Sequence, residues 1–427
     1  MIVAIFLATL ATGLLLGIPI AYTLILCGVT LMLYMDIFAA QIVSQNLVLG
    51  VDNFLLLAIP FFILAGEVMN QGGLSRRIIG VALAFLGHFK GGLGYVAIFS
   101  ALILASLSGS AIADSAALAA ILVPMMRQAG YNQGRSVGLM AAGGITAPVI
   151  PPSIALIVYG SMANVSIHEL FMAGIVPGLL MTASLVVAWR VVIGREAFAT
   201  LDRVGRAGRL QAIWSGLPAL GLPVLVIGGL RAGVFTPTEA AVIAVAYATV
   251  VGALVTRELT LAGFYGCLVR AARTSAVVMF LIGASGVSAW LITIANLPAA
   301  LIALIEPIVA SPMLLVAMIA LLVLVLGMVL DFAPLMLILL PMLVPVCEVA
   351  GIDLVYFGVI FVIAGAIGLL TPPVGNVLNV VAGVARVPME EVIVGVWPFL
   401  LAQISVLILL VLFPMIVIIP TDFLMGR

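Results

Sequence analysis

The chain has 427 residues, of which 65% are hydrophobic and 7% charged, and its formal net charge is zero. A soluble globular domain carries roughly 25% charged residues, so this chain has too little polar surface to face water. The composition excludes a soluble protein, offers no basic surface for nucleic acid, and predicts an all-α integral membrane protein in a lipid bilayer. The opening residues "IVAIFLATLATGLLLGIPIA" follow no basic segment, so we expect a first span here and not a cleaved signal peptide.

Apolar runs of roughly 20 residues predict the membrane spans in chain order. Two other regions, 91–126 and 311–346, are interrupted midway by polar or helix-breaking residues, at "SLSGS" (106–110) and "GMVLDFAP" (327–334). We therefore expect about ten full spans plus two helical hairpins, because a full span needs an unbroken apolar run. The expected spans lie near residues 2–18, 20–35, 53–70, 136–160, 169–193, 211–230, 237–256, 274–294, 354–382 and 391–418.

The basic residues in the loops predict the topology. Loops 71–90 and 127–135 are both basic, so both should be cytoplasmic, and the hairpin between them should be re-entrant. Two full spans joined by a short outer turn are the alternative. Loop 194–210 carries four arginines and should also be cytoplasmic. Loop 348–353 has no basic residue and should lie outside, as should residues 420–427, so the second hairpin opens to the opposite face.

The two halves of the chain repeat each other. Each half has five expected spans and one hairpin, and an odd number of spans inverts the second half relative to the first. The sequence therefore predicts an inverted-topology repeat, the common plan of secondary transporters. The matching residues lie 221 positions apart and include Pro124 and Pro345, Pro151-Pro152 and Pro372-Pro373, Gly144 and Gly365, and Pro177 and Pro398.

A helix break follows each hairpin, as "GGITAPVIPPS" (143–153) and "GLLTPPVGN" (368–376). Proline removes a backbone donor and glycine frees the backbone, so both stretches should be unwound. Unwound backbone within a membrane lines a cavity or binds an ion, and the half-helix that follows it offers free N–H groups and a positive dipole end. Proline kinks that serve only packing are the alternative.

Carbonyl and hydroxyl oxygens from the hairpin tips and the breaks are suited to a monovalent cation such as Na⁺. An intramembrane carboxylate is costly and points to function, which singles out Asp331 at the second tip and Asp114 beyond the first. We expect Asp331 near the ion, whereas Asp114 is a direct ligand, an orienting residue or a cap of hairpin amides. The residues predicted for Na⁺ are Ser108, Gly109, Ser110, Gly144, Thr146, Pro148, Asp331, Thr371, Pro372 and Gly375.

No arginine lies within either tip or either break. An acidic substrate should then be held by half-helix N-termini, hydroxyl groups and amide side chains. An intramembrane enzyme that uses the hydroxyls of the first tip would need a histidine or lysine to activate them, and neither His88 nor His168 is placed for this. We expect no catalytic residue and no organic cofactor. The residues predicted for substrate are Ser110, Pro152, Ser153, Pro373, Asn376 and Asn379.

Four stretches resemble the signatures of the large membrane (M) subunit of TRAP transporters, the tripartite ATP-independent periplasmic transporters. They are "SGSAIADSAALAAILVP", "GGITAPVIPPSIALIVYG", "LDFAPLMLILLP" and "GLLTPPVGNVLN". The resemblance implies a Na⁺-driven elevator in the bacterial inner membrane that imports small organic acids, such as C4-dicarboxylates, keto acids, sugar acids or sialic acid. It also implies a soluble periplasmic substrate-binding protein (P subunit) and a small four-span Q membrane subunit. We expect Q as a separate chain, because no such segment precedes Met1.

Paired hairpins and breaks also occur in the wider superfamily of divalent-anion/Na⁺ symporters, so a self-sufficient homodimeric dicarboxylate symporter is the alternative. Such symporters typically carry Ser-Asn-Thr at both tips. The tips here read Ser-Gly-Ser and Leu-Asp-Phe, which favours the TRAP reading.

The elevator reading divides the chain into a mobile and a static part. The hairpins and breaks, 91–160 and 311–382, should form the transport domain. The frame should consist of three segments. Residues 1–90 should supply scaffold spans and an arm helix, and residues 161–310 should supply further scaffold spans, a cytoplasmic linker and the start of the second repeat. Residues 383–427 should supply a final span and a periplasmic tail.

Overall fold

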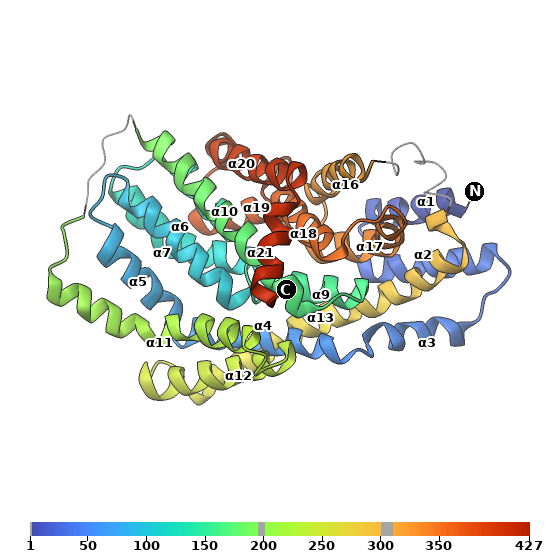
Figure 1. The fold of residues 1–427 in the computed structure, drawn as a ribbon, viewed down its shortest axis with the longest axis horizontal. Helices are drawn as coiled ribbons and strands as arrows, with labels where there is room; N and C mark the ends of the chain where they lie inside the picture. Colours follow the sequence, from blue (N-terminus) through green and yellow to red (C-terminus); the bar gives the residue numbers. More distant parts are fainter. Residues whose placement is uncertain (1, 195–200, 300–310) are drawn as a thin grey trace.

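The computed structural model describes residues 2–194, 201–299 and 311–427. Within these ranges every regular element is a helix, as the composition predicts. Figure 1 shows α6 and α7 toward one end of the long axis, α16 and α17 toward the other, and α9, α18 and α21 between them. The helices of the first half are α1 (Ile2–Leu15), α2 (Ile20–Tyr34), α3 (Ala40–Val51), η1 (Phe54–Leu57), α4 (Ala58–Gln71), α5 (Leu74–Leu86), α6 (Gly92–Ser108), α7 (Ala111–Gln128), α8 (Gln133–Gly144), α9 (Ile154–Ala163) and α10 (Ile167–Ile193).

The second half begins after the linker and follows the same order. Its helices are α11 (Arg206–Arg231), α12 (Pro237–Val250), η2 (Val251–Val255), α13 (Leu261–Ile294), α16 (Pro312–Gly327), α17 (Phe332–Val349), α18 (Leu354–Leu370), α19 (Asn376–Ala385), α20 (Met389–Leu412) and α21 (Met415–Met425).

The repeat of 221 positions extends well beyond the prolines that first reveal it. Helix α7 shifted by 221 positions falls on α17, and α3 to α4 together fall on α13, which is a single helix of 34 residues. The contacts between the halves follow the same relation: α8 packs on α20 and α18 on α10, while α7 packs on α19 and α17 on α9. The fold is therefore an inverted-topology repeat whose halves interlock.

Two helices related by the repeat, α8 and α18, begin at polar residues that are also related by the repeat. Asn132 caps α8 by accepting the Arg135 amide, and its repeat mate Asp353 caps α18 by accepting the Tyr356 amide. Asn and Asp are strong N-caps because the side-chain oxygen satisfies an amide that has no partner within the helix. The start of each broken span is thus set by local chemistry in both halves.

Three expected boundaries were wrong. Helix α3 occupies 40–51, where no span was expected, because its Gln and Asn residues lower its hydropathy. Helix α13 begins at Leu261 and not at 274. The expected span started later because Arg270 and Arg273 interrupt the apolar run, although they do not interrupt the helix. The last span ends at Leu412, and the expected tail contains the separate helix α21. Residues 300–310, at the end of the expected segment 161–310, lie outside the described residues.

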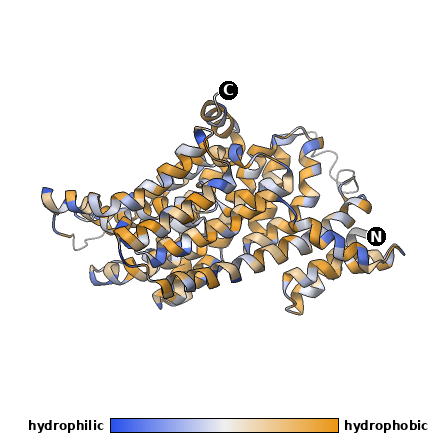
Figure 2. Cartoon of the chain, turned by 90° about the horizontal axis from the view of Figure 1, so that it is seen from below, coloured by the Kyte–Doolittle hydropathy of each residue, from blue (hydrophilic) through white to orange (hydrophobic). Residues whose placement is uncertain are grey.

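The lengths and composition of the helices fit a chain that crosses a membrane many times. Seven described helices are long and apolar enough to span a bilayer. Two expected spans, 136–160 and 354–382, are instead pairs of shorter helices, α8 with α9 and α18 with α19. Figure 2 shows hydrophobic residues over most of the helical surface and hydrophilic ones mainly at helix ends and loops. Apolar residues exposed along the spanning helices, such as Val187 of α10 (63% exposed), suit contact with lipid.

Four short segments interrupt the helices of the two hairpins and the two broken spans. Tip 1 is residues 108–110, between α6 and α7, and tip 2 is residues 328–331, between α16 and α17. Break 1 is residues 145–153, between α8 and α9, and break 2 is residues 371–375, between α18 and α19. All four fall where the sequence predicts them, because proline, glycine and small hydroxyl residues interrupt the apolar runs there.

Candidate functional site

One cavity of about 430 Å³ brings both tips together. The two tips and the first turns of α7 and α17 form one part of its wall. The edges of the two breaks and helix α9 form a second part, and one face each of α4 and α13 forms the third. The lining residues are Ile63, Gly66, Glu67, Asn70, Ser108, Gly109, Ser110, Ala111, Ile112, Ala113, Pro148, Ile154, Ala155, Val158, Thr274, Val278, Asp331, Phe332, Ala333, Met336 and Leu369.

At tip 1 two residues, Gly109 and Ser110, connect α6 to α7, and the hydroxyl groups of Ser108 and Ser110 hold this turn. Gly109 has φ +62°, a left-handed conformation that glycine adopts without strain. The Ser108 hydroxyl accepts the Ser110 amide at 3.1 Å and donates to Asp114 Oδ1 at 2.5 Å. The Ser110 hydroxyl caps α7 by accepting the Ala113 amide at 3.4 Å. Asp114 therefore orients the tip through Ser108, while Ser110 supplies the cap.

Tip 1 lies directly on break 1. A Cβ added to Gly109 would come within 3.0 Å of the Pro152 carbonyl oxygen, so only glycine allows this approach. On the other side of α7, a Cβ on Gly144 would come within 1.7 Å of the Ser115 hydroxyl. Backbone oxygens of break 1 and side-chain oxygens of the hairpin therefore lie within a small volume.

Two buried oxygens near break 1 have no hydrogen-bond partner among the described residues: Asp114 Oδ2 and the Ser115 hydroxyl. Asp114 is 3% exposed and Ser115 is fully buried. Buried polar atoms are nearly always paired in native proteins, so unpaired oxygens point to a missing ligand. Each of these two oxygens has a lone pair available for a cation or for an ordered water.

Break 1 is braced by its own side chains. The Thr146 hydroxyl donates to the Gly143 carbonyl at 2.7 Å. The Ser153 hydroxyl donates to the Pro148 carbonyl and accepts the Leu156 amide at 3.2 Å, which makes Ser153 the N-cap of α9. Pro148 reaches the cavity, whereas Thr146 and Ser153 are buried. The predicted substrate contact of the Ser153 hydroxyl therefore competes with its role as a cap.

Tip 2 carries the exposed carboxylate. Asp331 caps α17, since its Oδ1 accepts the Phe332 amide at 2.8 Å, and the residue is exposed at the cavity. Asp331 occupies the repeat position of Ser110, and both cap the second helix of a hairpin. The Gly375 amide donates to the Met328 carbonyl at 3.2 Å, which joins tip 2 to break 2.

Break 2 gathers backbone oxygens around one glycine. A Cβ on Gly375 would lie 3.2 Å from the Thr371 carbonyl oxygen and 3.3 Å from that of Leu369. The Thr371 hydroxyl itself donates to the Ile367 carbonyl at 2.7 Å. The carbonyl oxygens lie close together at break 2, whereas the Thr371 hydroxyl is already engaged, and the use of break 2 for Na⁺ stays a prediction.

The predicted substrate residues do not all converge. Ser110 lines the cavity, and Pro152 and Ser153 lie beside it in break 1. Pro373, Asn376 and Asn379 are not among the residues that line it. The Asn379 side-chain amide donates to the Val374 carbonyl at 2.8 Å and so braces break 2.

The wall formed by α4 and α13 was missed by the sequence reasoning, which searched only tips and breaks. Glu67, Asn70 and Thr274 line the cavity there. Glu67 Oε2 accepts a hydrogen bond from Arg270 Nε at 2.6 Å, so an arginine lies close to the cavity after all. The signal was present, because Glu67 and Asn70 are polar residues near the end of an expected apolar span.

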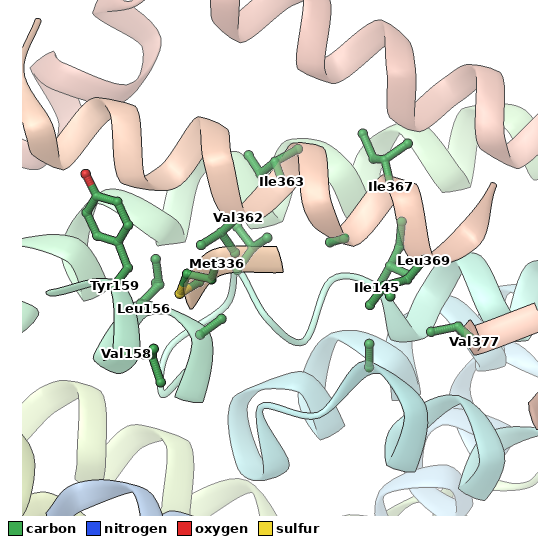
Figure 3. Close-up of a cluster of buried hydrophobic side chains, with 14 of the residues drawn as sticks. Ile145, Leu156, Val158, Tyr159, Met336, Val362, Ile363, Ile367, Leu369 and Val377 are labelled. Atoms are coloured by element: carbon green, nitrogen blue, oxygen red, sulfur yellow. The ribbon is translucent and has the colours of Figure 1, made fainter. Parts of the chain in front are cut away.

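An apolar core lies behind the tips and breaks and joins the two halves. Figure 3 shows Ile145 of break 1, Leu156 of α9, Met336 of α17, and Val362 and Ile367 of α18 gathered in one cluster. Tyr159 of α9 also donates its hydroxyl hydrogen to the Leu354 carbonyl of α18 at 2.7 Å. These contacts join residues of both halves behind the tips and breaks. The expected limits of the transport domain, 160 and 382, lie within α9 and α19, which end at 163 and 385, and the division of the chain stays a prediction.

The chemistry of the site is that of a binding cavity. Among the described residues no group of three or more His, Cys, Asp or Glu side chains is placed to hold a metal ion. The cavity lining is mostly apolar, and its polar side chains are Glu67, Asn70, Ser108, Ser110, Thr274 and Asp331.

Comparisons with known proteins agree on one family. Residues 7–416 match the family described as "Tripartite ATP-independent periplasmic transporter, DctM component". The 2,3-diketo-L-gulonate TRAP transporter large permease protein YiaN of Escherichia coli is 50% identical over 98% of this chain and 99% of its own. The sialic acid TRAP transporter large permease protein SiaM of Vibrio cholerae is 36% identical over 96% of each chain.

A solved structure shares the fold. The YdaH transporter of Alcanivorax borkumensis, whose topology is described as unusual, superposes with a TM-score of 0.57 over 87% of each chain. The sequence identity is 17%, so this likeness bears on the fold alone.

Proposed function

The chain belongs to the DctM family of tripartite ATP-independent periplasmic transporters, and we propose that it is the Na⁺-coupled importer of a small organic acid, working by an elevator mechanism. As the large permease component it is a multi-pass membrane protein, which we place in the bacterial inner membrane. The observation that carries the proposal is the convergence of both tips on one cavity, with a break directly behind each tip.

Coupling to Na⁺ is supported by the oxygens that surround the tips and breaks. Near break 1, Asp114 Oδ2 and the Ser115 hydroxyl are buried without a partner in the described chain. Near break 2, two backbone carbonyls converge on Gly375. The Asp331 carboxylate lines the same cavity and would repel an anionic substrate. Cations at these places would offset its negative charge. Two such places, related by the repeat, suggest more than one ion per cycle.

The elevator is supported by the way the cavity is divided. Tips, breaks and α9 form one wall of the cavity, whereas α4 and α13 form the other. In the expected topology Glu67, Asn70 and Thr274 lie toward the cytoplasmic ends of α4 and α13, which supports an inward-open state. Toward the other side, Asn53 donates to the Ser161 hydroxyl of α9 at 3.0 Å and links the two parts.

The substrate is an organic acid, in keeping with the relatives that are named for diketogulonate and sialic acid. Its carboxylate would lie between tip 1 and the start of α9, where Ile154 borders the cavity and the helix presents its N-terminal amides. Ser110 is the hydroxyl best placed to bind it. A periplasmic binding protein would deliver the substrate, and a small four-span Q subunit would brace the frame.

Reconstituted transport tests the proposal. The chain is placed in proteoliposomes with its small membrane subunit, and the binding protein and labelled substrate are added outside. Uptake should require an inward Na⁺ gradient and should vanish when choline replaces Na⁺. Equal uptake in choline would exclude Na⁺ coupling. Uptake without binding protein and small subunit would favour the alternative of a self-sufficient symporter.

A further inference from the structure

A second groove lies away from the transport site, between α6 and α10. It has a volume of about 560 Å³. In the expected topology it lies at the cytoplasmic side, because it begins at the basic turn that joins α5 to α6. The lining residues are Leu86, Phe89, Lys90, Tyr95, Ile98, Phe99, Leu102, Thr182, Val186 and Arg190.

The groove has a charged end and an apolar body. Lys90, the one lysine in the sequence, and Arg190 are both exposed, and neither forms an ion pair with any described residue. The segments that carry the two cations are joined by a hydrogen bond between their neighbours, in which Trp189 Nε1 donates to the Gly91 carbonyl at 2.9 Å. Lys90 and Arg190 both line the groove near this junction.

The apolar body extends from the cations toward the membrane interior. Arg190, Val186 and Thr182 follow one another at intervals of four residues and therefore share one face of α10. Eight residues of helix rise about 12 Å, which is the depth over which this face borders the groove. Thr182 is no polar obstacle, because its hydroxyl donates to the Gly178 carbonyl at 2.9 Å.

We propose that this groove binds an anionic phospholipid of the cytoplasmic leaflet, with its headgroup phosphate between Lys90 and Arg190 and an acyl chain along α6 and α10. Basic residues at the cytoplasmic surface attract anionic lipids, and pockets between helices that combine cations with apolar walls select their headgroups. A soluble anion would not use the apolar body, and a helix of a partner protein would leave the cations unpaired.

The repeat shows that the fold itself does not require these cations. The positions 221 residues further on are Ser311 and Val411, at the periplasmic side of the second half in the expected topology. The same helix pair is built there without charge. The cations are therefore specific to the face of the membrane that carries the anionic lipid.

The lipid site would lie at a boundary of interest for transport. Helix α6 belongs to the first hairpin, and α10 belongs to the expected frame. A lipid in this groove would contact both, so its binding should depend on their relative position. The binding proposal itself does not rest on the proposed transport function.

Native mass spectrometry tests the site on the complete chain, purified with its small membrane subunit. The detergent-solubilised complex is titrated with phosphatidylglycerol or phosphatidylcholine. Lys90→Gln with Arg190→Gln should lower phosphatidylglycerol binding about tenfold or more and leave phosphatidylcholine binding unchanged, because each lost cation removes attraction to the headgroup. Val186→Trp fills the groove but keeps both cations, and it should lower phosphatidylglycerol binding as well.

The matched control is Arg203→Gln with Arg206→Gln, which removes two exposed cations from the same side of the membrane. This variant should bind phosphatidylglycerol like the wild type. Undiminished binding to the Lys90/Arg190 variant would overturn the proposal. Full binding of phosphatidylglycerol to Val186→Trp would also overturn it, because the cations would then act only as general surface charge. Equal competition by glycerol phosphate would overturn it too, because the site would then bind a soluble anion.

Discussion

Two carboxylates within the expected membrane, Asp331 and Asp114, differ sharply in their surroundings. Asp331 is exposed at the cavity and caps α17 with one oxygen. Asp114 is buried and holds tip 1 through the Ser108 hydroxyl. We expect Asp331→Asn to raise the Na⁺ concentration for half-maximal uptake about tenfold or more, because a charge-assisted contact is roughly twice as strong as a neutral one. Asp114→Asn should slow uptake with little change in that concentration.

The measurement is the Na⁺ dependence of uptake in proteoliposomes for both variants beside the wild type. Asn is the matched replacement, since it keeps the size and one acceptor of Asp while it removes the charge. A large shift for Asp114→Asn together with none for Asp331→Asn would invert the roles. The unpaired Asp114 Oδ2 would then be a direct ion ligand and not an orienting group.

At the scale of helices, hairpin 2 (α16 and α17) depends on one close contact between glycines. A Cβ on Gly368 of α18 would come within 2.7 Å of Gly327 Cα at the end of α16, where only backbone can yield. Gly368→Val should therefore separate tip 2 from break 2 and cost about 1–3 kcal/mol, as overpacking of a core typically does. Thermal unfolding in detergent should show a lower midpoint than the wild type.

Gly383 of α19 supplies the matched control for this substitution. It lies on an exposed helical face, and a Cβ there would meet no atom within 4 Å. Gly383→Ala should leave the midpoint unchanged or raise it, since Ala is favoured over Gly in a helix by roughly 0.5–1 kcal/mol. An equal loss in both variants would mean that α18 and α19 tolerate no side-chain change, and the contact with Gly327 would have no special role.

The same scale shows which elements a sequence can predict. Tips and breaks were predicted within a few residues, because proline and glycine act on the local backbone regardless of tertiary context. Helix α3 was missed because its polar residues, among them Gln45 and Asn46, do not resemble a span, although Gly50 packs against Gly283 of α13. Asn379 was placed at the substrate because spacing along a helix does not reveal which face meets the cavity. Its role as a brace of break 2 became visible only once α19 was placed.

At the scale of the molecule, the two walls of the cavity are each built from elements of both halves of the repeat. Helices α4 and α13 are repeat mates and form one wall of the cavity, while the hairpins and breaks of both halves form the other. The hairpins and breaks of the two halves contact each other through α7 with α19 and α17 with α9. Relative motion is then expected at the boundary between the two walls.

A cysteine bridge across this boundary tests the motion. Gly66 of α4 faces tip 1, and the Cβ that it would gain lies 3.4 Å from the Cβ of Ser108. Disulfides join Cβ atoms about 3.8 Å apart, so Gly66→Cys with Ser108→Cys should form a bridge in the described state. The background must lack Cys27, Cys267 and Cys347, which are free and buried. Oxidation should stop the uptake that the reduced variant retains after loss of the Ser108 hydroxyl, and reduction should restore uptake to that level.

The control bridge lies within the frame, between α1 and α2. The Cβ that Gly13 would gain lies 3.2 Å from the Cβ of Thr23, so Gly13→Cys with Thr23→Cys should also form a bridge. Uptake should continue after oxidation, because neither helix moves relative to the other in an elevator. Crosslinking between positions 66 and 108 should also fall when Na⁺ and loaded binding protein are present, since both favour a state in which tip 1 has moved along α4. A bridge at 66 and 108 that forms fully under every condition and leaves uptake intact would exclude an elevator.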